Sequence, residues 1–566
     1  MLARGWTGLD VLIVTGDAYV DHPSFGAAMI ARVLEAEGLR VGVAAQPDWR
    51  TAEALQGMGR PRLFCGVTAG NLDSMLANYT AARHRRREDD YTEGGLPERR
   101  PNHAAVVYAQ LARRAFPGLP VVLGGIEASL RRVAHYDYWE DRLRPSILVD
   151  SKADLLVYGM GESAVRQVAR RLAEAAGSGN VPDLSGIRGT ARLLGARAAA
   201  SLTMDEAVVL PSWEELQEDR ALLMQATRMV ETQQSPFCGK RLVQFHGARA
   251  VVVEPPATPL GEAELDALYD LPFTRRPHPA HTAPIPAYTM IRDSVTVVRG
   301  CAGGCSFCGL GLHQGKFIAS RSEASVLREV GRIASAPDFR GTVSDLGGPS
   351  ANLYGCRNGV DGACRACRRP SCLFPAICSH FNIAEEPALG VLRQARAVPG
   401  VKHVFVQSGI RMDVALRTPK YLRELVRHHV SGHLKVAPEH LHPAVLRRMR
   451  KPGGVFGPFQ EAFRKESAAA RKEQYLVPYF ISSFPGCTEP EMRVVRDFLR
   501  TSRWNLQQVQ DFIPLPMTPA AAMYVTGLDY ETGEPIPVAR RAGERLRQRG
   551  ALGSAPVRRG RSPGIR

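Results

Sequence analysis

The sequence predicts an α/β protein with a doubly wound N-terminal domain followed by a partial (β/α)6 barrel. Two observations predict this class. Short β-branched runs alternate with helical stretches over the first 200 residues, and six more strand-and-helix units follow residue 294. Strands that alternate with helices pair in parallel, since each helix returns the chain along the sheet. We predict an N-terminal domain over 1–200, a connector over 201–285, a barrel domain over 286–535 and a basic disordered tail over 536–566.

The N-terminal domain is predicted to begin with a strand, a helix and a second strand. Val11–Val14 is a short β-branched run, apolar residues at helical spacing extend from Phe25 to Leu34, and Gly38 ends the helix. Open α/β sheets bind ligands at the carboxyl ends of their strands. Further strands are predicted at 41–43, 63–67, 121–125 and 155–159, and glycines mark three of their ends: Gly66, Gly124–Gly125 and Gly159.

The segment 201–285 is less regular, and prolines crowd its end. We therefore predict a connector packed between domains, with a helix from Trp213 to Met229. The barrel follows. Its parallel strands should carry the chemistry in the loops at their carboxyl ends. Strands are predicted at 295–298, 342–346, 403–407, 434–437, 476–481 and 508–513.

A cysteine-rich loop directly follows the first barrel strand. Cys301, Cys305 and Cys308 form a C-x3-C-x2-C pattern, and glycines around them relieve backbone crowding. Three thiolates can hold a four-iron cluster and leave one iron without a protein ligand. Phe307 would screen the site from water, which helps set the reduction potential. The spacing thus indicates a [4Fe-4S] cluster with one open corner.

Two other uses of these thiols remain open. A zinc site would close with a fourth ligand, and His313 lies five positions after Cys308. The three thiols could also be inert and buried. A disulfide framework is not expected, because 11 cysteines in 566 residues without a secretory signal are typical of a reducing compartment.

The C-x3-C-x2-C loop, with an aromatic residue before its last cysteine, resembles the signature of the radical S-adenosylmethionine (SAM) superfamily. The flanking segments Ser294–Cys301 and Gly315–Ser322 resemble the YgiQ-type family within it. The similarity runs from about residue 8 to about residue 535. The resemblance implies that SAM chelates the open iron. An external electron donor of flavodoxin or ferredoxin type then drives its cleavage to a 5′-deoxyadenosyl radical, which abstracts hydrogen from an unknown substrate.

The resemblance also implies a SAM pocket at the ends of the next barrel strands. Asp345–Pro349 stands where radical SAM enzymes carry a Gly-Gly-Glu segment, and here proline replaces the glutamate. The alternative to a SAM-binding role for this loop is a simple turn. The alternative for Arg411 is a buried ion pair with Asp413 or Glu439. No general base or nucleophile can be named. The residues assigned to the pocket are Phe307, Gly347, Gly348, Ser408, Arg411 and Glu439.

A second group of five cysteines lies within 23 residues of the barrel domain. It could hold an auxiliary cluster or a zinc ion, with His380 as a further ligand. Intervening arginines would lower the pKa values of the thiols. The alternative is a redox-sensing or structural set. The five are Cys356, Cys364, Cys367, Cys372 and Cys378.

The N-terminal domain resembles the cobalamin-binding domains that precede some radical SAM barrels. The resemblance rests on Gly124–Ala128 and Gly159–Glu162. The lower-axial-ligand motif Asp-x-His-x-x-Gly does not occur, because Asp21 is followed directly by His22. We therefore expect a vestigial or substrate-shaping domain, and bound cobalamin is the disfavoured alternative.

The net charge of +17 is concentrated at the C-terminus, where residues 540–566 hold nine arginines and one acid, Glu544. Such a tail could bind nucleic acid through counterion release, but a solvated terminus is preferred. No apolar run reaches the ~18 residues that span a bilayer, and the first residues lack a secretory signal. We expect a cytoplasmic protein without a membrane partner.

Three functions follow from these features. The first is a radical SAM enzyme acting on an unknown substrate. The second is methylthiotransfer to transfer RNA, which is disfavoured because such enzymes carry three further cysteines in the N-terminal domain, whereas only Cys65 lies in the first 200 residues. The third is a non-catalytic protein with two metal staples and an arginine tail that holds RNA.

Overall fold

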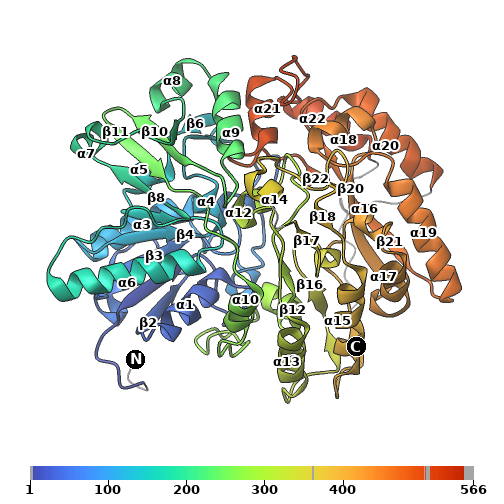
Figure 1. Cartoon of the computed structure of the whole chain (residues 1–566), viewed down its shortest axis with the longest axis horizontal. Coiled ribbons are helices and arrows are strands. Elements are labelled where there is room, and N and C mark those ends of the chain that lie inside the picture. The colour runs from blue at the N-terminus through green and yellow to red at the C-terminus, as the bar shows by residue number, and fades with distance from the viewer. Residues whose placement is uncertain (1–3, 360–361, 503, 505–509, 553–566) are drawn as a thin grey trace.

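The computed structural model describes the whole chain except residues 1–3, 360–361, 503, 505–509 and 553–566. Two halves lie side by side (Figure 1). The N-terminal half contains a large sheet with helices on both faces, and the C-terminal half contains shorter strands with an outer layer of helices. None of the helices formed by the described residues combines the length and apolar character needed to cross a bilayer.

A nine-stranded sheet in the order β2-β1-β3-β4-β7-β8-β11-β10-β9 organises the N-terminal half. Its first five strands are mutually parallel. This confirms the predicted α/β class with a large parallel sheet. The order 2-1-3-4-5 of these strands is that of flavodoxin-like sheets, which bind ligands where the strand order reverses. The five are β1 (Val11–Thr15), β2 (Val41–Ala45), β3 (Phe64–Thr68), β4 (Val121–Gly124) and β7 (Leu155–Val157).

Helices cover both faces of this sheet because successive side chains of each strand point to opposite faces. Val11 and Ile13 of β1 pack with α1 (Gly26–Ala36) and α6 (Glu162–Ser178). Leu12 and Val14 pack on the other face with α3 (Ala104–Ala115). Burial on both faces explains why these strands are continuous apolar runs.

The predicted connector is not a connector over its whole length. Three strands within it, β9, β10 and β11, complete the sheet together with the preceding β8, and β10 and β11 form an antiparallel hairpin. The predicted helix from Trp213 to Met229 is divided, since α8 (Trp213–Glu218) ends at Asp219 and α9 (Leu222–Thr232) follows. Mixed edge strands lack the strand-and-helix alternation used for prediction. They are β8 (Thr190–Leu194), β9 (Ala207–Val209), β10 (Arg241–His246) and β11 (Arg249–Val253).

Each of the six strands predicted in the C-terminal half overlaps an observed strand. The parallel pairs are β12 with β16, β15 with β19, and β20 with β21 and β22. Residues 505–509, where the last predicted strand begins, lie outside the described residues. The strands are β12 (Ser294–Thr296), β15 (Thr342–Val343), β16 (Asp345–Gly347), β19 (His403–Val404), β20 (His433–Glu439), β21 (Tyr475–Ser482) and β22 (Gln510–Asp511).

Helices pack around these strands (Figure 1). They share one apolar core with the strands, which includes Val330, Leu392, Phe459 and Val495. The helices of this layer are α13 (Glu323–Ala334), α15 (Glu385–Ala397), α17 (Pro419–Glu424), α19 (Phe456–Ala469) and α20 (Glu489–Thr501).

The tail predicted to be disordered forms a helix in its described part, α22 (Ala542–Gly550). Arg545 is buried and donates to the backbone oxygen of Phe512, and the side-chain amide of Gln548 donates to that of Cys487. The prediction of disorder was wrong for this stretch, because arginine can bury its aliphatic stem when its guanidinium finds carbonyl acceptors. Residues 553–566 lie outside the described residues.

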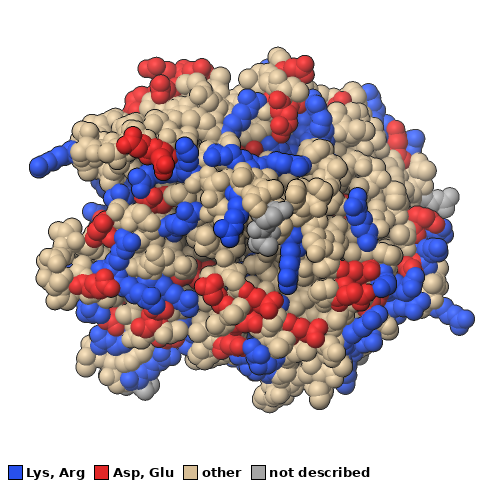
Figure 2. Space-filling view, in the orientation of Figure 1, with Lys and Arg blue, Asp and Glu red and all other residues tan. Residues whose placement is uncertain are grey.

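Charged side chains of both signs are interspersed over the face shown in Figure 2. Nucleic-acid-binding surfaces gather lysine and arginine into one stripe or groove. On this face, therefore, the charge distribution gives no support to the RNA-binding alternative.

Candidate functional site

A cavity of about 510 Å³ lies between the two halves, above the carboxyl ends of the parallel strands of the N-terminal sheet. This is the edge at which open α/β sheets bind ligands. The N-terminal half contributes strand-end residues, and the C-terminal half contributes the region around the first cysteine loop. The lining includes Gly66, Thr68, Gly124 and Gly159 from the former and Val298, Arg299, Leu310, His313, Gln314 and Gly348 from the latter.

Glycines keep this cavity open. A Cβ atom added to Gly66 or Gly124 would meet nothing closer than 3.6 Å and 3.9 Å, so a larger side chain there would extend into free space. Gly125 and Gly159 have φ angles of +84° and +74°, which favour glycine. A flat, bulky ligand could therefore approach the backbone of these strands closely.

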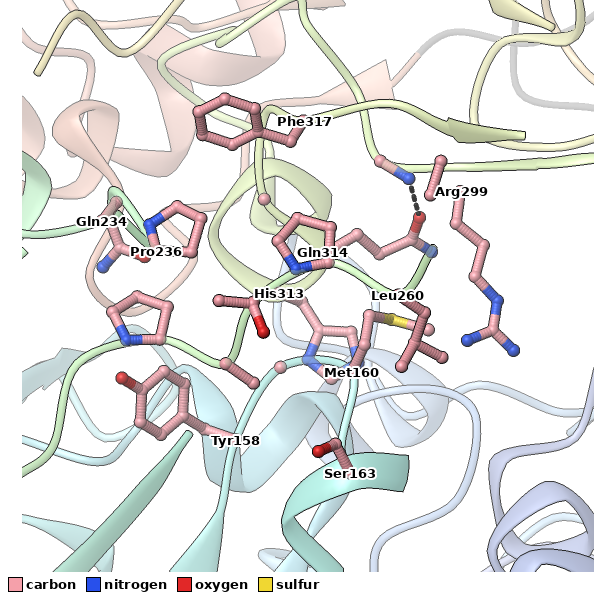
Figure 3. A pocket seen from close by; sticks show the side chains of 18 of the residues that line it. Tyr158, Met160, Ser163, Gln234, Pro236, Leu260, Arg299, His313, Gln314 and Phe317 are labelled. Carbon is pink, nitrogen blue, oxygen red and sulfur yellow. Dashed lines mark hydrogen bonds between the residues drawn. The ribbon is translucent and has the colours of Figure 1, made fainter. Parts of the chain in front are cut away.

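A second, smaller cavity of about 70 Å³ adjoins the first (Figure 3). The helix α12 (Gly309–Gln314) stands between the two, since His313 and Gln314 line both. The remaining lining is largely apolar and includes Pro236, Leu260 and Phe317, which Figure 3 labels. The side-chain oxygen of Gln314 accepts from the backbone N–H of Gly300 at 3.0 Å, drawn as a dashed line.

A buried ion pair joins the two halves beside the large cavity. Arg299 Nη1 donates to Glu162 Oε1 at 2.7 Å, and Arg299 Nε donates to the hydroxyl of Tyr269 at 3.0 Å. Burial opposes ionisation of Glu162, but the Arg299 guanidinium outweighs it and holds the pKa of Glu162 below its usual range. Glu162 Oε2 is buried without a hydrogen-bond partner among the described residues. It can accept a hydrogen bond from a ligand in the cavity.

The first cysteine loop lies between β13 (Val298–Arg299) and α12. Burial, together with the neighbouring thiol of Cys305, raises the pKa of Cys301 and of Cys308, the latter to about 12. Arg411 Nη1 lies 3.9 Å from Cys305 Sγ and offsets this effect at Cys301. The structure thus places Arg411 beside the predicted ligand loop, and burial disfavours the thiolate forms of Cys301 and Cys308.

In the described part of the chain, no group of three or more Cys, His, Asp or Glu side chains converges as a ready site for a single metal ion. The zinc alternative required His313 near Cys308. Instead, His313 Nδ1 lies 3.0 Å from Ser129 Oγ of α4 (Gly125–Ser129) in the N-terminal half. The structure therefore separates His313 from the role that its sequence position suggested.

The residues assigned to a SAM pocket fall into separate groups. Gly348 N–H donates to Ser408 Oγ at 3.3 Å, and a Cβ at Gly347 would overlap that same Oγ. Arg411 pairs with Asp413 through Nη2 and Oδ2 at 2.6 Å, which is the buried ion pair weighed as an alternative. Glu439 is buried, and burial raises its pKa against the opposing charge of Lys451. Phe307 packs edge-to-face on Phe484.

The second cysteine group is tied to the first loop through the backbone. Ser371 Oγ donates to the carbonyl oxygens of Ala302 and Gly303, and Cys372 N–H donates to that of Ala302. Lys316 Nζ lies 3.5 Å from Cys367 Sγ, and Asn358 Nδ2 donates to Cys372 Sγ at 3.3 Å.

The expectation that arginines lower the thiol pKa values in this second group was wrong for Cys372. Burial raises the pKa of Cys372, and the opposing cation is Lys316. Two of the intervening arginines contact other residues. Arg368 Nη1 donates to Gln233 Oε1, and Arg365 lies over the ring of Phe237.

The pKa of His313 predicts a loss of stability in acid. Burial lowers this pKa to about 4, with Arg132 and Arg299 adding to burial and Glu162 opposing it. The unfolded chain binds this proton near pH 6.5, so the stabilising effect is complete above pH 6.5 and is lost between pH 6.5 and 4. We expect the free energy of unfolding at pH 5 to fall by about 2 kcal/mol more in the wild type than in His313→Gln. Equal losses, measured by urea unfolding at pH 7 and pH 5, would contradict this expectation.

Sequence comparison now places the chain in a family. The family model described as "Radical SAM N-terminal" matches residues 1–294. UPF0313 protein GSU2873 of Geobacter sulfurreducens is 51% identical to this chain, and the alignment covers 97% of this chain and 90% of that protein. UPF0313 protein blr7973 of Bradyrhizobium diazoefficiens is 47% identical, and that alignment covers 94% of this chain and 81% of the relative. The chain belongs to the UPF0313 family of radical SAM proteins. The recognition drawn from the first cysteine loop is confirmed.

Solved structures share the fold of this UPF0313 protein at low sequence identity. The radical SAM methyltransferase TsrM of Kitasatospora setae, with cobalamin and a [4Fe-4S] cluster bound, has a TM-score of 0.54 and 16% identity over 97% of this chain and 92% of its own. The same enzyme with tryptophan and a SAM analogue bound has a TM-score of 0.52 and 16% identity. That match covers 96% of this chain and 88% of the enzyme.

The expectation that this UPF0313 protein does not bind cobalamin is contradicted by these neighbours, because a protein of the same fold carries cobalamin. The missing Asp-x-His-x-x-Gly motif was a poor guide. The motif supplies one axial ligand, whereas a crevice at the strand ends can hold a macrocycle without it.

Two residues of the site were missed as partners. Arg299 and Glu162 were quoted within motifs, but neither received a role. Their placement was a usable signal, because Arg299 stands two positions before Cys301 and Glu162 follows the glycines after β7. A charged residue at the carboxyl end of a buried strand needs a partner or a ligand.

Proposed function

We propose that this UPF0313 protein is a radical SAM enzyme with two cofactors besides SAM. Cys301, Cys305 and Cys308 hold a [4Fe-4S] cluster, and the large interdomain cavity holds cobalamin. When bound, the cluster supplies the electron that cleaves SAM, and a donor of flavodoxin or ferredoxin type replaces that electron. The observation that carries the proposal is the cavity itself, which glycine-ended strands line together with the elements that flank the cluster loop.

The chain's own residues bind the cofactors, orient them and exclude water from the site. Arg299 ties the start of the cluster loop to the N-terminal half through Glu162, and Gln314 ties it to α12 by accepting from the N–H of Gly300. Arg411 places positive charge beside Cys305, which would stabilise thiolates. We assign SAM to Gly347, Gly348, Ser408 and Glu439. The six parallel strands that carry these loops constitute, in this proposal, the partial (β/α)6 barrel.

The residues around the cavity fit a corrin ring. Open space above Gly66 and Gly124 accepts a flat macrocycle, and the unpaired Glu162 Oε2 can accept from one of its amide side chains. The competing functions have less support. Cys65, the one cysteine of residues 1–200, is buried in β3 with a pKa raised to about 12, so this region does not supply the three thiolates that methylthiotransfer would use.

The proposal is tested by anaerobic reconstitution with iron and sulfide, followed by dithionite and SAM. We expect about four irons per chain and release of 5′-deoxyadenosine. Stoichiometric zinc without SAM cleavage would overturn the radical assignment. Separately, hydroxocobalamin should bind the reconstituted protein at a ratio of one to one, as followed by its absorption after gel filtration.

A glycine substitution tests the corrinoid site. Gly124→Leu should weaken cobalamin binding by about tenfold or more, equivalent to about 1.4 kcal/mol, because the new side chain occupies the cavity without backbone strain. Equilibrium dialysis against hydroxocobalamin measures the effect. Gly177→Leu on α6, where a Cβ meets nothing within 4 Å, is the matched control and should bind as the wild type does. Equal affinities in both variants would place the ligand elsewhere.

A further inference from the structure

We propose that His313 is an axial ligand, through Nε2, to the cobalt of a corrinoid bound in the interdomain cavity. The inference rests on the proposed function, since it concerns the same cavity. His313 lies on α12, five residues after the last cysteine of the first loop, and lines the cavity where α12 packs against the N-terminal half beside Gly159. It would connect the two cofactor sites through one short helix.

Hydrogen bonds determine which ring nitrogen carries the proton. Ser129 Oγ donates to the carbonyl oxygen of Gly125 at 2.8 Å, which uses its single proton. The same oxygen accepts from Gly159 N–H at 3.2 Å. Towards His313 Nδ1, at 3.0 Å, it can therefore only accept. We therefore assign the ring proton to Nδ1, which leaves the lone pair of the imidazole on Nε2.

Such a histidine is prepared to bind a metal. Ligating histidines donate their other N–H to an acceptor that fixes the tautomer and the ring orientation, and Ser129 is that acceptor here. Burial keeps the ring neutral, because the pKa of His313 is lowered to about 4. No hydrogen bond of Nε2 occurs among the described residues. Figure 3 shows His313 beside Met160 and Gln314, and all three residues line both cavities.

The other histidine considered as a cobalt ligand is engaged elsewhere. His22 Nε2 lies 2.7 Å from Arg275 Nη2, and its Nδ1 accepts from Ser24 N–H at 3.1 Å. Both nitrogens thus already have protein partners, and His22 does not line the large cavity. This leaves His313 as the histidine that the cavity presents among the described residues.

Electron paramagnetic resonance tests the assignment directly. The protein is loaded with hydroxocobalamin and reduced to the cobalt(II) form. A ¹⁴N ligand splits each cobalt line into three, and a ¹⁵N ligand splits it into two. We expect three lines from unlabelled protein and two from protein containing ¹⁵N-histidine, because the ligand is then a histidine of the chain and not the base of the cofactor. His313→Gln should lose the histidine splitting and retain corrinoid binding within about threefold.

His246→Gln is the matched control. His246 is also buried with a pKa lowered to about 4, but it lies on β10 and does not line the cavity. It should keep the splitting of the wild type. Bound corrinoid that shows no nitrogen splitting, or three lines in the ¹⁵N-histidine protein, would overturn the assignment of His313 and leave the proposed function standing. Failure of the wild type to bind any corrinoid would overturn both.

Discussion

Alanine in place of Cys301, Cys305 and Cys308 together is expected to abolish SAM cleavage. A loop without these thiolates cannot hold a four-iron cluster, and a loop with only one or two cannot hold one with a single open corner. The source of the electron is therefore lost. Release of 5′-deoxyadenosine should fall to the level seen without protein. The measurement is anaerobic turnover with dithionite and SAM, together with iron and sulfide content after reconstitution. Each single variant should show the same loss of activity.

Cys65→Ala is the control for this experiment. Cys65 is buried in β3, away from the cysteine loop, and its replacement should leave iron content and turnover unchanged. A triple variant that still cleaves SAM would place the cluster at another site. Metal that remains in an inactive triple variant would assign a second centre to the later cysteines, which are tied to the first loop through Ser371 and Cys372.

Glu162→Ala is expected to destabilise the fold strongly. Removing this carboxylate leaves Arg299 buried, with the hydroxyl of Tyr269 as its remaining side-chain hydrogen-bond partner. A buried pair that loses one partner costs about 3–5 kcal/mol, chiefly because the other charge remains uncompensated. The midpoint of thermal unfolding should fall by several degrees, and the cluster loop should become more open to protease because Arg299 directly precedes it.

Two further variants test whether the loss of stability comes from the buried, unpaired charge of Arg299. Glu461→Ala removes an exposed carboxylate that pairs with Arg464 on α19, and its unfolding midpoint should not change. The double variant Glu162→Leu/Arg299→Met removes both buried charges and should recover much of the lost stability. Equal midpoints for Glu162→Ala and Glu461→Ala would show that the buried pair does not hold the two halves together.

Local patterns in the chain were sufficient to predict most strands and the cysteine loop. The β-branched runs at Val11–Val14 and 121–125 became β1 and β4, because a buried parallel strand is recognisable from a few consecutive apolar residues. The C-x3-C-x2-C spacing lies within eight residues, so the three thiols are close in any fold that places a loop there. The same reasoning failed at α22, where burial of Arg545 depends on a carbonyl 33 residues away.

The sequence by itself determined the α/β class, the family and the three cysteines, since each depends on residues that are neighbours along the chain. Tertiary structure alone decided how the halves meet. Arg299 and Glu162 are 137 residues apart, and His313 and Ser129 are 184 apart, yet each pair forms a hydrogen bond. No periodicity or spacing encodes such partners. They arise only when helix α12 packs against the glycine-ended strands, which also creates the cavity between the halves.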